Sequence, residues 1–324
     1  MLNKNKRKIF ITGGGGFIGA NLIRALLKSN KYEVHVLIRN SGIPWRLESI
    51  ADKIILHPGD ITNYASIRRS VINCKPDYII HLAVYGAYHF QTNLKKIMNV
   101  NILGTENLLR ATIDIPYRLF INTGTSSEYG RKNGTMKETQ ICNPMSYYAA
   151  TKLGATLICK VFSEIENKPI LTFRLFSVYG PYEEYTRLIP TIMYSILKKK
   201  IISLSPGKQH RDFIFSEDVC RAYLKALCLG EKLKGEIINI GSGIEYTNKE
   251  IVENTFKSTK DITVVKENSY LGRAWDIPHW KADITHAKNI LGFQAKYSID
   301  KGLHTTYSWF KENTKYYQVF YEKK

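Results

Sequence analysis

The sequence predicts an α/β protein built on a doubly wound parallel sheet, with a smaller lobe formed mainly by its C-terminal part. Strand-like and helix-like periods alternate through the first half of the 324 residues. Several strand segments, such as residues 78–84, are almost wholly apolar, as strands covered by helices on both faces must be. A glycine-rich turn over residues 13–19 connects the first strand to the first helix. Together these features indicate a doubly wound fold.

The individual elements follow from the same periods. Apolar residues three or four apart mark helices, as Ile18, Leu22 and Leu26 do in the first one. Strands are expected at residues 8–12, 33–39, 53–57, 78–84, 118–123 and 170–176. Helices are expected between them at residues 17–28, 67–73, 94–113 and 146–166. A further helix over 212–229 and a strand over 236–240 return to the sheet, and the remainder completes the second lobe.

The composition is typical of a soluble globular protein. Apolar residues make up 44% of the chain and charged residues 23%. No apolar run approaches the roughly 18 residues that a membrane helix needs. Only Ile9, Phe10 and Ile11 precede the glycines, which is too short for the apolar core of a signal peptide. We therefore expect a cytoplasmic protein without a membrane partner.

Cysteine usage and charge narrow the classes of partner. The five cysteines are scattered and form no Cys-x-x-Cys pair, so neither a disulfide framework nor a metal site is predicted. The net charge of +19 suits anionic ligands. Because the lysines are spread along the chain and no recognised nucleic-acid module accompanies them, nucleic-acid binding is not favoured.

The glycine-rich turn predicts a dinucleotide site. Gly13, Gly16 and Gly19 satisfy the spacing Gly-x-x-Gly-x-x-Gly between a strand and an amphipathic helix. Glycines allow the backbone to approach a pyrophosphate, which rests on the N-terminus of the helix that Phe17 and Ile18 begin. This is the dinucleotide-binding arrangement of a Rossmann fold.

The end of the second strand bears on the choice of dinucleotide. An acidic residue there would hold the ribose hydroxyls of NAD, but this chain has Arg39. A cation at this point favours the 2′-phosphate of NADP. NAD stays an alternative, because a strand-end arginine can also be solvated.

Tyr148 and Lys152 stand four residues apart on a predicted helix, so they share one face. A phenol titrates near 10, and lowering that pKa by about three units needs roughly 4 kcal/mol of preferential stabilisation of the phenolate. A neighbouring ammonium can contribute to this, as can the positive ring of an oxidised nicotinamide. Tyr148 is then suited to general acid–base work beside a dinucleotide.

With the glycine turn and the Tyr148–Lys152 pair, the chain resembles the extended short-chain dehydrogenases/reductases, and within them the nucleotide-sugar epimerases, dehydratases and ketoreductases. The resemblance covers nearly the whole chain. It implies a dinucleotide-binding domain over residues 1–176 and 212–242 and a substrate-binding lobe over 177–211 and 243–324. Further segments that carry it are residues 59–61, 81–83, 101–105, 125–130, 174–181, 211–213, 280–283 and 291–293.

The resemblance assigns roles to particular residues. Thr125, Tyr148 and Lys152 correspond to the family's catalytic residues, with Tyr148 exchanging a proton with the sugar oxygen that Thr125 orients. Contacts to the cofactor are implied for Gly13, Gly16, Phe17, Ile18, Gly19, Arg39, Asp60, Ile61, Leu82, Ala83, Tyr148 and Lys152. Contacts to a nucleotide-diphosphate sugar are implied for Tyr85, Ser126, Ser127, Ser177, Arg187 and Arg211.

Departures from the family pattern narrow the reaction. Dehydratases of this family carry Asp-Glu directly after the threonine, where this chain has Ser126 and Ser127. Glu128 comes one residue late, and an extended segment would direct it to the opposite side. The first hypothesis is therefore an NADP(H)-dependent 4-ketoreductase of a nucleotide-linked 4-keto-6-deoxy sugar.

Two alternatives stay open. A nucleotide-sugar 4-epimerase uses the same residues but keeps its NAD bound through both half-reactions. A non-catalytic protein that binds NADP or RNA is the more distant alternative. The helices over 94–113 and 146–166 resemble those that form a four-helix interface in the family, which implies a homodimer.

Overall fold

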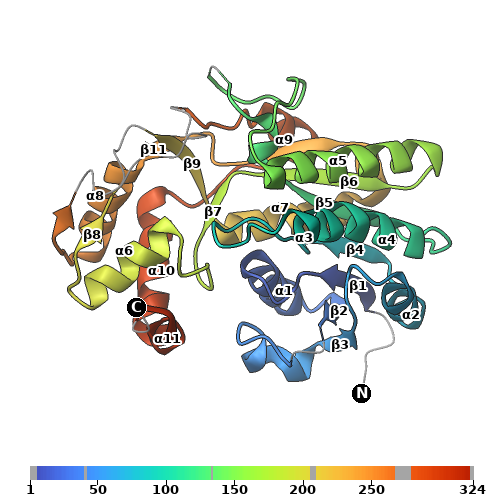
Figure 1. The fold of residues 1–324 in the computed structure, drawn as a ribbon, viewed down its shortest axis with the longest axis horizontal. Coiled ribbons are helices and arrows are strands. Elements are labelled where there is room, and N and C mark those ends of the chain that lie inside the picture. Colours follow the sequence, from blue (N-terminus) through green and yellow to red (C-terminus); the bar gives the residue numbers. More distant parts are fainter. Residues whose placement is uncertain (1–5, 40–41, 133, 205–208, 267–278, 322–324) are drawn as a thin grey trace.

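The computed structural model describes residues 6–39, 42–132, 134–204, 209–266 and 279–321, and it confirms the doubly wound parallel sheet (Figure 1). Seven strands form the sheet in the order β10-β6-β5-β4-β1-β2-β3, and all their pairings are parallel. Their bounds are β1 (Arg7–Thr12), β2 (Tyr32–Ile38), β3 (Ile55–Pro58), β4 (Tyr78–His81), β5 (Leu119–Thr125), β6 (Ile170–Leu175) and β10 (Ile237–Ile240).

The strand order reverses at β1. The chain runs outward through β2 and β3 on one side and then returns to place β4 on the other side. Thr12 at the end of β1 therefore pairs with both Leu37 of β2 and His81 of β4. A crevice at the carboxyl ends of the strands at such a switch point is where open α/β sheets bind ligands.

Helices cover both faces of the sheet and enclose two cores (Figure 1). The helices α1 (Phe17–Ser29) and α7 (Ser216–Leu229) pack on the face to which Ile9 and Ile11 point. The opposite face, to which Phe10 points, is covered by α2 (Tyr64–Cys74), α4 (Gly104–Ala111) and α5 (Tyr147–Ile165). This burial on both sides explains why the strands read as nearly continuous apolar runs.

The predicted helix over 94–113 is interrupted in the structure. It consists of α3 (Leu94–Met98), a π-helical turn (Asn99–Leu103) and α4. The π-turn holds the buried Asn101, whose amide donates to the backbone carbonyl of Tyr85 and to Thr151 and whose oxygen accepts from the Tyr85 N–H. Such turns are frequent at functional sites.

The predicted helix over 212–229 is wrong at its start, because residues 212–215 belong to the strand β9 (His210–Phe215) and α7 begins at Ser216. Asp212 explains the difference. Its buried carboxylate accepts hydrogen bonds from the backbone N–H groups of Ser242, Gly243 and Ala282 and from the Ser242 hydroxyl. These long-range bonds hold the segment extended, whatever its local helical period.

The second lobe gathers on the left of Figure 1, at one end of the large sheet. Its core joins aromatic and aliphatic residues of four helices with those of the short strands. The remaining α-helices and strands are β7 (Ser177–Tyr179), α6 (Leu188–Leu197), β8 (Ile202–Ser203), β11 (Glu245–Thr247), α8 (Asn248–Thr259), β12 (Val265–Lys266), α9 (Thr285–Leu291), α10 (Ile299–Asn313) and α11 (Lys315–Tyr321). Of these, α9 packs in the core of the large sheet. Within the described ranges, no helix is long and apolar enough to cross a membrane.

We predict that protonation of His81 destabilises the fold at acidic pH. Burial, together with the charge of Lys152, lowers the pKa of His81 to about 3, so the native state holds this ring neutral between Thr12 and Thr105. The unfolded chain binds the proton near pH 6.5, so stability is lost as the pH falls below that value toward 3. One such histidine contributes at most about 1.4 kcal/mol per pH unit.

Urea denaturation between pH 7 and pH 5 measures this slope. His81→Gln should reduce the pH dependence of the free energy of unfolding by up to about one bound proton. His89 is exposed, and His89→Gln should leave this pH dependence unaltered. An equal slope in wild type and His81→Gln would refute the assignment.

Candidate active site

The glycine turn lies against the end of β4. Gly13 has a φ of +72°, and a Cβ there would come within 2.5 Å of the backbone of Leu82 and Ala83. A Cβ on Gly19 would come within 2.6 Å of the Gly13 carbonyl oxygen, which accepts from the Gly16 N–H at 3.0 Å. Only glycines allow this packing.

The start of α1 has the features of an anion site. No side chain caps this helix, and no acidic residue lies in its first turn, which contains Phe17, Ile18 and Gly19. The N–H groups of a first turn have no partner within their own helix, and the helix dipole favours negative charge there. The turn therefore fits the pyrophosphate of a dinucleotide.

The strand ends beside this turn carry the residues implied for the adenosine half. Arg39 is exposed after β2, and Asp60 follows β3. Asp60 accepts from both the N–H and the hydroxyl of Thr62, so it closes a local turn. Burial raises the pKa of Asp60, but the Thr62 hydrogen bonds and the charge of Arg39 lower it overall. Ile61 is buried and packs against Gly104.

Thr125 and Tyr148 come together at the end of β5. Ser146 caps α5 by accepting from the Ala149 N–H at 3.1 Å, which fixes the helix turn that carries Tyr148. Burial raises the pKa of Tyr148, whereas its interaction with the Thr125 hydroxyl and the charge of Arg187 lower it. Thr125 and Arg187 thus favour the phenolate, but burial outweighs them, so the pKa of Tyr148 is raised overall. The contribution of Lys152 stays a prediction.

Lys152 lies one turn further along α5 and is only 3% exposed. Burial lowers the pKa of its ammonium, and the carboxylate of Glu128 opposes this shift. Its charge reaches His81 at the end of β4. Lys152 therefore connects the Thr125–Tyr148 pair with the strand ends beside the glycine turn, where a dinucleotide would extend its nicotinamide half.

Glu128 is fixed in the interior. Residues Ser126–Tyr129 form a 3-10 helix and not the expected extended segment, because Thr125 and Glu128 make a reciprocal capping box. The Glu128 carboxylate accepts from the Thr125 N–H at 2.8 Å and pairs with Nε of Arg174 at 2.8 Å. The expectation that an extended segment directs Glu128 to the opposite side is therefore wrong in its premise, and the structure instead binds the carboxylate to Arg174 and to the Thr125 N–H.

The two serines that follow Thr125 differ in surroundings. Ser126 is buried, and its hydroxyl accepts a hydrogen bond of 2.7 Å from the indole Nε1 of Trp280. Ser127 is half-buried, and its N–H donates to the Thr125 hydroxyl. Trp280 was not among the predicted site residues, although the segment 280–283 had been noted in the sequence.

Two arginines reach this region from the second lobe. Arg187, just before α6, lies close enough to Tyr148 to lower its pKa, and it also donates to the Ala87 carbonyl at 3.0 Å. The guanidinium carbon of Arg211 lies 5.1 Å from the centre of the Trp280 ring. The structure thus places Arg211 at Trp280, while Arg187 contacts Ala87 and Tyr88 and acts on Tyr148 through its charge.

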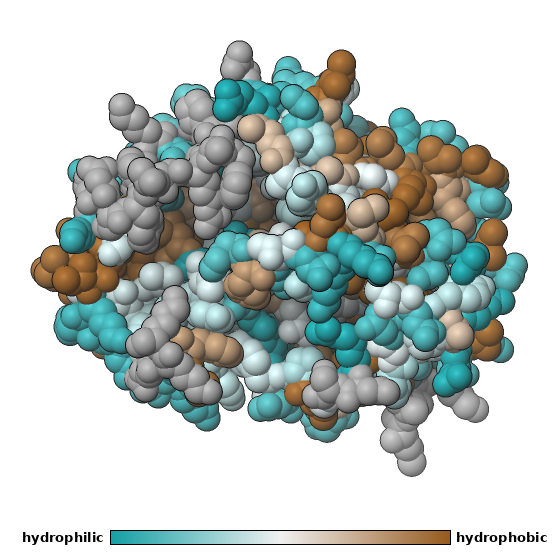
Figure 2. Space-filling view, in the orientation of Figure 1, coloured by the Kyte–Doolittle hydropathy of each residue, from teal (hydrophilic) through white to brown (hydrophobic). Residues whose placement is uncertain are grey.

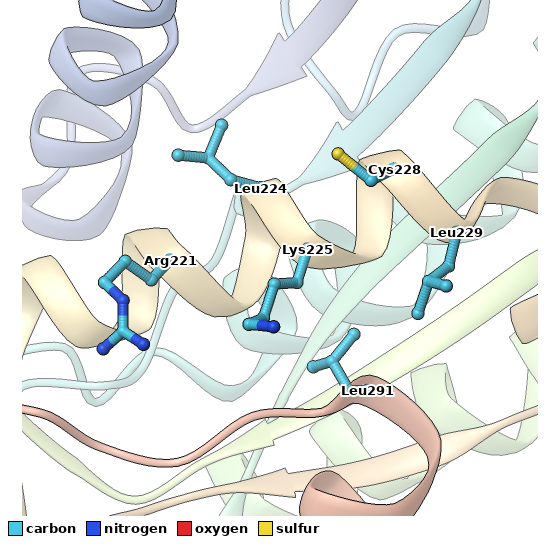
Figure 3. A pocket seen from close by; sticks show the side chains of 6 residues that line it. All are labelled: Arg221, Leu224, Lys225, Cys228, Leu229 and Leu291. Carbon is cyan, nitrogen blue, oxygen red and sulfur yellow. The ribbon is translucent and has the colours of Figure 1, made fainter.

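The other predicted substrate contacts, Tyr85 and Ser177, are held by elements other than the Thr125–Tyr148 pair. Tyr85 is half-buried and held through its backbone by Asn101. Ser177 is half-buried in β7, opposite Phe213 of β9. A separate depression over α7 is largely apolar and contains none of the predicted site residues (Figure 3). It is lined by Arg221, Leu224, Lys225, Cys228, Leu229 and Leu291.

Comparison with known proteins identifies the family. Residues 9–241 match the model of the NAD dependent epimerase/dehydratase family, and the chain belongs to that family. It is 29% identical to a UDP-N-acetyl-alpha-D-glucosaminuronate decarboxylase of Bacillus cytotoxicus, over 95% of this chain and 98% of the relative. It is equally identical to a UDP-glucuronate 4-epimerase of Thermodesulfobacterium geofontis, over 94% and 96%.

Among solved structures, the chain resembles the UDP-glucuronic acid 4-epimerase of Bacillus cereus in complex with UDP-glucuronic acid and NAD. The TM-score is 0.84 at 27% identity, covering 94% of this chain and 99% of that one. The chain is thus a member of a family of NAD-dependent enzymes of the short-chain dehydrogenase/reductase type, and the relatives named here act on nucleotide sugars. The preference for NADP predicted from Arg39 finds no support in this comparison, since the solved relative holds NAD.

We predict that Glu128→Gln lowers the free energy of unfolding by about 3 kcal/mol, because it leaves the buried Arg174 guanidinium without its counter-charge. Urea denaturation measures the change. The exposed pair of Glu106 and Arg110 supplies the control, and Glu106→Gln should cost less than about 0.5 kcal/mol. Equal losses in the two variants would show that the buried pair does not hold this region.

Proposed function

We propose that the protein is a nucleotide-sugar 4-epimerase that keeps NAD bound through its reaction. One observation carries this: Tyr148 and Thr125 form a site for one proton, while the acid that follows them, Glu128, is bound to Arg174 and to the Thr125 N–H. Oxidation and reduction at a single carbon need one such proton-transfer group. Expulsion of water would need a second, and Ser126 and Ser127 offer no carboxylate.

The residues divide the work at the sugar. Tyr148 accepts the proton of the C4 hydroxyl and later returns it, while the Thr125 hydroxyl orients that oxygen. Lys152 holds the nicotinamide ribose, and the glycine turn with the start of α1 holds the pyrophosphate. The dinucleotide, when bound, supplies an acceptor and donor for the C4 hydrogen as hydride.

Retained NAD is preferred over the NADP(H)-dependent ketoreductase that the sequence first indicated. Two of the similar proteins described above are named as 4-epimerases, and the solved one holds NAD.

We further propose that the substrate carries a carboxylate on its sugar. The Arg187 guanidinium, whose charge lowers the pKa of Tyr148, is suited to pair with a carboxylate at the carbon next to C4. The three similar proteins described above are named for uronic acid nucleotides. In this proposal residues 1–176 and 212–242 bind the dinucleotide, and residues 177–211 and 243–324 bind the substrate.

A homodimer through α5 is also proposed. Leu157, Val161 and Ile165 follow one another at intervals of four residues on α5 and are 50–73% exposed. Met98 and Leu103, on the neighbouring helix around the π-turn, are about half exposed as well. Apolar side chains gather over α5 on the right of Figure 2. A contiguous apolar surface of this kind indicates a protein interface.

The proposed reaction predicts that the purified protein converts UDP-glucuronate to UDP-galacturonate without added dinucleotide. Mass spectrometry of the denatured protein should release NAD. Tyr148→Phe should lower kcat at least about a hundredfold while NAD stays bound, because the proton-transfer group is lost. Tyr147→Phe is the matched control, since that neighbouring phenol is 64% exposed and should be dispensable.

Three outcomes would contradict the proposal. A strict requirement for NADPH would favour the ketoreductase, and release of carbon dioxide would favour a decarboxylase, since oxidation at C4 turns a uronate into a β-keto acid. Full activity of Tyr148→Phe would remove that residue from the reaction. A UDP-glucose assay run in parallel tests the carboxylate, which should raise kcat/KM.

The proposed interface predicts that Val161→Asp converts a dimer into a monomer, because a charge at the centre of an apolar contact stays unpaired. Light scattering after size exclusion measures the mass. Ile262→Asp, at a residue 67% exposed in the second lobe, should leave the dimer intact. A monomeric wild type, or a Val161→Asp variant that is still dimeric, would rule out this surface.

A further inference from the structure

Two histidines and a glutamate from distant parts of the chain converge on one face of the small three-stranded sheet. His210 lies in β9 and Glu245 in β11, and these strands pair antiparallel with Thr247 opposite His210. Glu245 is therefore the diagonal neighbour of His210 on the same face. His279, directly before Trp280 in the chain, joins them. One ligand atom from each of the three lies within 4.8 Å of the others.

The contacts among the three are close. Nδ1 of His279 lies 2.7 Å from Oε1 of Glu245. The imidazoles of His210 and His279 are stacked, with ring centres 5.0 Å apart and planes inclined by 18°. The second carboxylate oxygen of Glu245 accepts from the Trp280 N–H at 3.3 Å, which orients the carboxylate.

We propose that His210, Glu245 and His279 bind a divalent transition-metal ion such as Zn²⁺. Two imidazole nitrogens and a carboxylate oxygen are a known ligand set for Zn²⁺, with a fourth position left to water or a ligand. Bonds of about 2.0–2.2 Å place tetrahedral ligand atoms roughly 3.3 Å apart. The three donors lie within 4.8 Å of one another in the structure, so binding would draw them closer by side-chain rotation.

A second pair in the same protein shows what sets this cluster apart. His286 and Glu236 also lie 2.7 Å apart. An ion pair needs only one histidine and one acid. The second imidazole, stacked beside the first, adds the nitrogen donor that a metal site requires.

The site would act on the candidate active site through Trp280. This residue directly follows His279, and its indole donates to Ser126, next to Thr125. Arg211, next to His210, lies over the same indole ring. A bound ion would therefore fix the Trp280 segment against β9 and β11. It would contact neither Tyr148 nor the glycine turn, so the inference does not rest on the proposed reaction.

The test is a Zn²⁺ titration of untagged protein, followed by calorimetry, in a Cys228→Ser background that removes the exposed thiol. We expect one ion per chain. Replacing His210, Glu245 or His279 by alanine should in each case weaken the affinity for Zn²⁺ at least tenfold. His286→Ala is the matched control and should bind as the background protein does.

A second readout separates metal ligation from stability. Co²⁺ in place of Zn²⁺ should give the visible absorption of nitrogen and oxygen ligands, and His279→Ala should abolish it while keeping the circular dichroism of the parent. Zn²⁺ binding that survives the triple Ala variant would overturn the proposal. A loss of Zn²⁺ affinity in His286→Ala equal to that of the ligand variants would overturn it as well.

Discussion

The buried ion pair between Glu128 and Arg174 holds the end of β5, on which the arrangement of the site depends. The Glu128 carboxylate accepts a hydrogen bond from the Thr125 N–H, and a Cβ on Gly124 would come within 2.5 Å of this carboxylate. Its charge also acts on the pKa of Tyr148 and of Lys152. A fully desolvated charge must be paired to be tolerated, so the geometry around it is rigidly specified. Thr125 is thereby presented to Tyr148 from a fixed strand end.

The dinucleotide half of the site depends on a different constraint, the contact between the glycine turn and the end of β4. His81 joins these elements, because its ring lies between Thr12 of β1 and Thr105 of α4 and feels the charge of Lys152. A neutral, fully buried histidine keeps the two strand ends in register without adding a charge. The two strand ends at the switch point are therefore connected to each other and to α4 by hydrogen bonds.

Much of this could be predicted from the sequence, and the reasons are local. Apolar strands, the glycine spacing and the four-residue spacing of Tyr148 and Lys152 depend on neighbours along the chain. What could not be predicted depends on residues far apart. Asp212 lies in a strand because amides some 30 and 70 residues away converge on it. The same holds for Trp280 at Ser126 and for the grouping of His210 with Glu245 and His279, which no sequence spacing reveals.

The central claim is that hydrogen leaves C4 of a nucleotide sugar and returns to the same carbon within one bound complex, with Tyr148 moving the proton. The most direct measurement uses UDP-glucuronate deuterated at C4, incubated with the purified protein without added dinucleotide. Mass spectrometry and nuclear magnetic resonance of the epimerised product then locate the label. We predict that the deuterium is fully retained at C4. Exchange of the C4 label with solvent, or no product unless a reductant is added, would contradict the account.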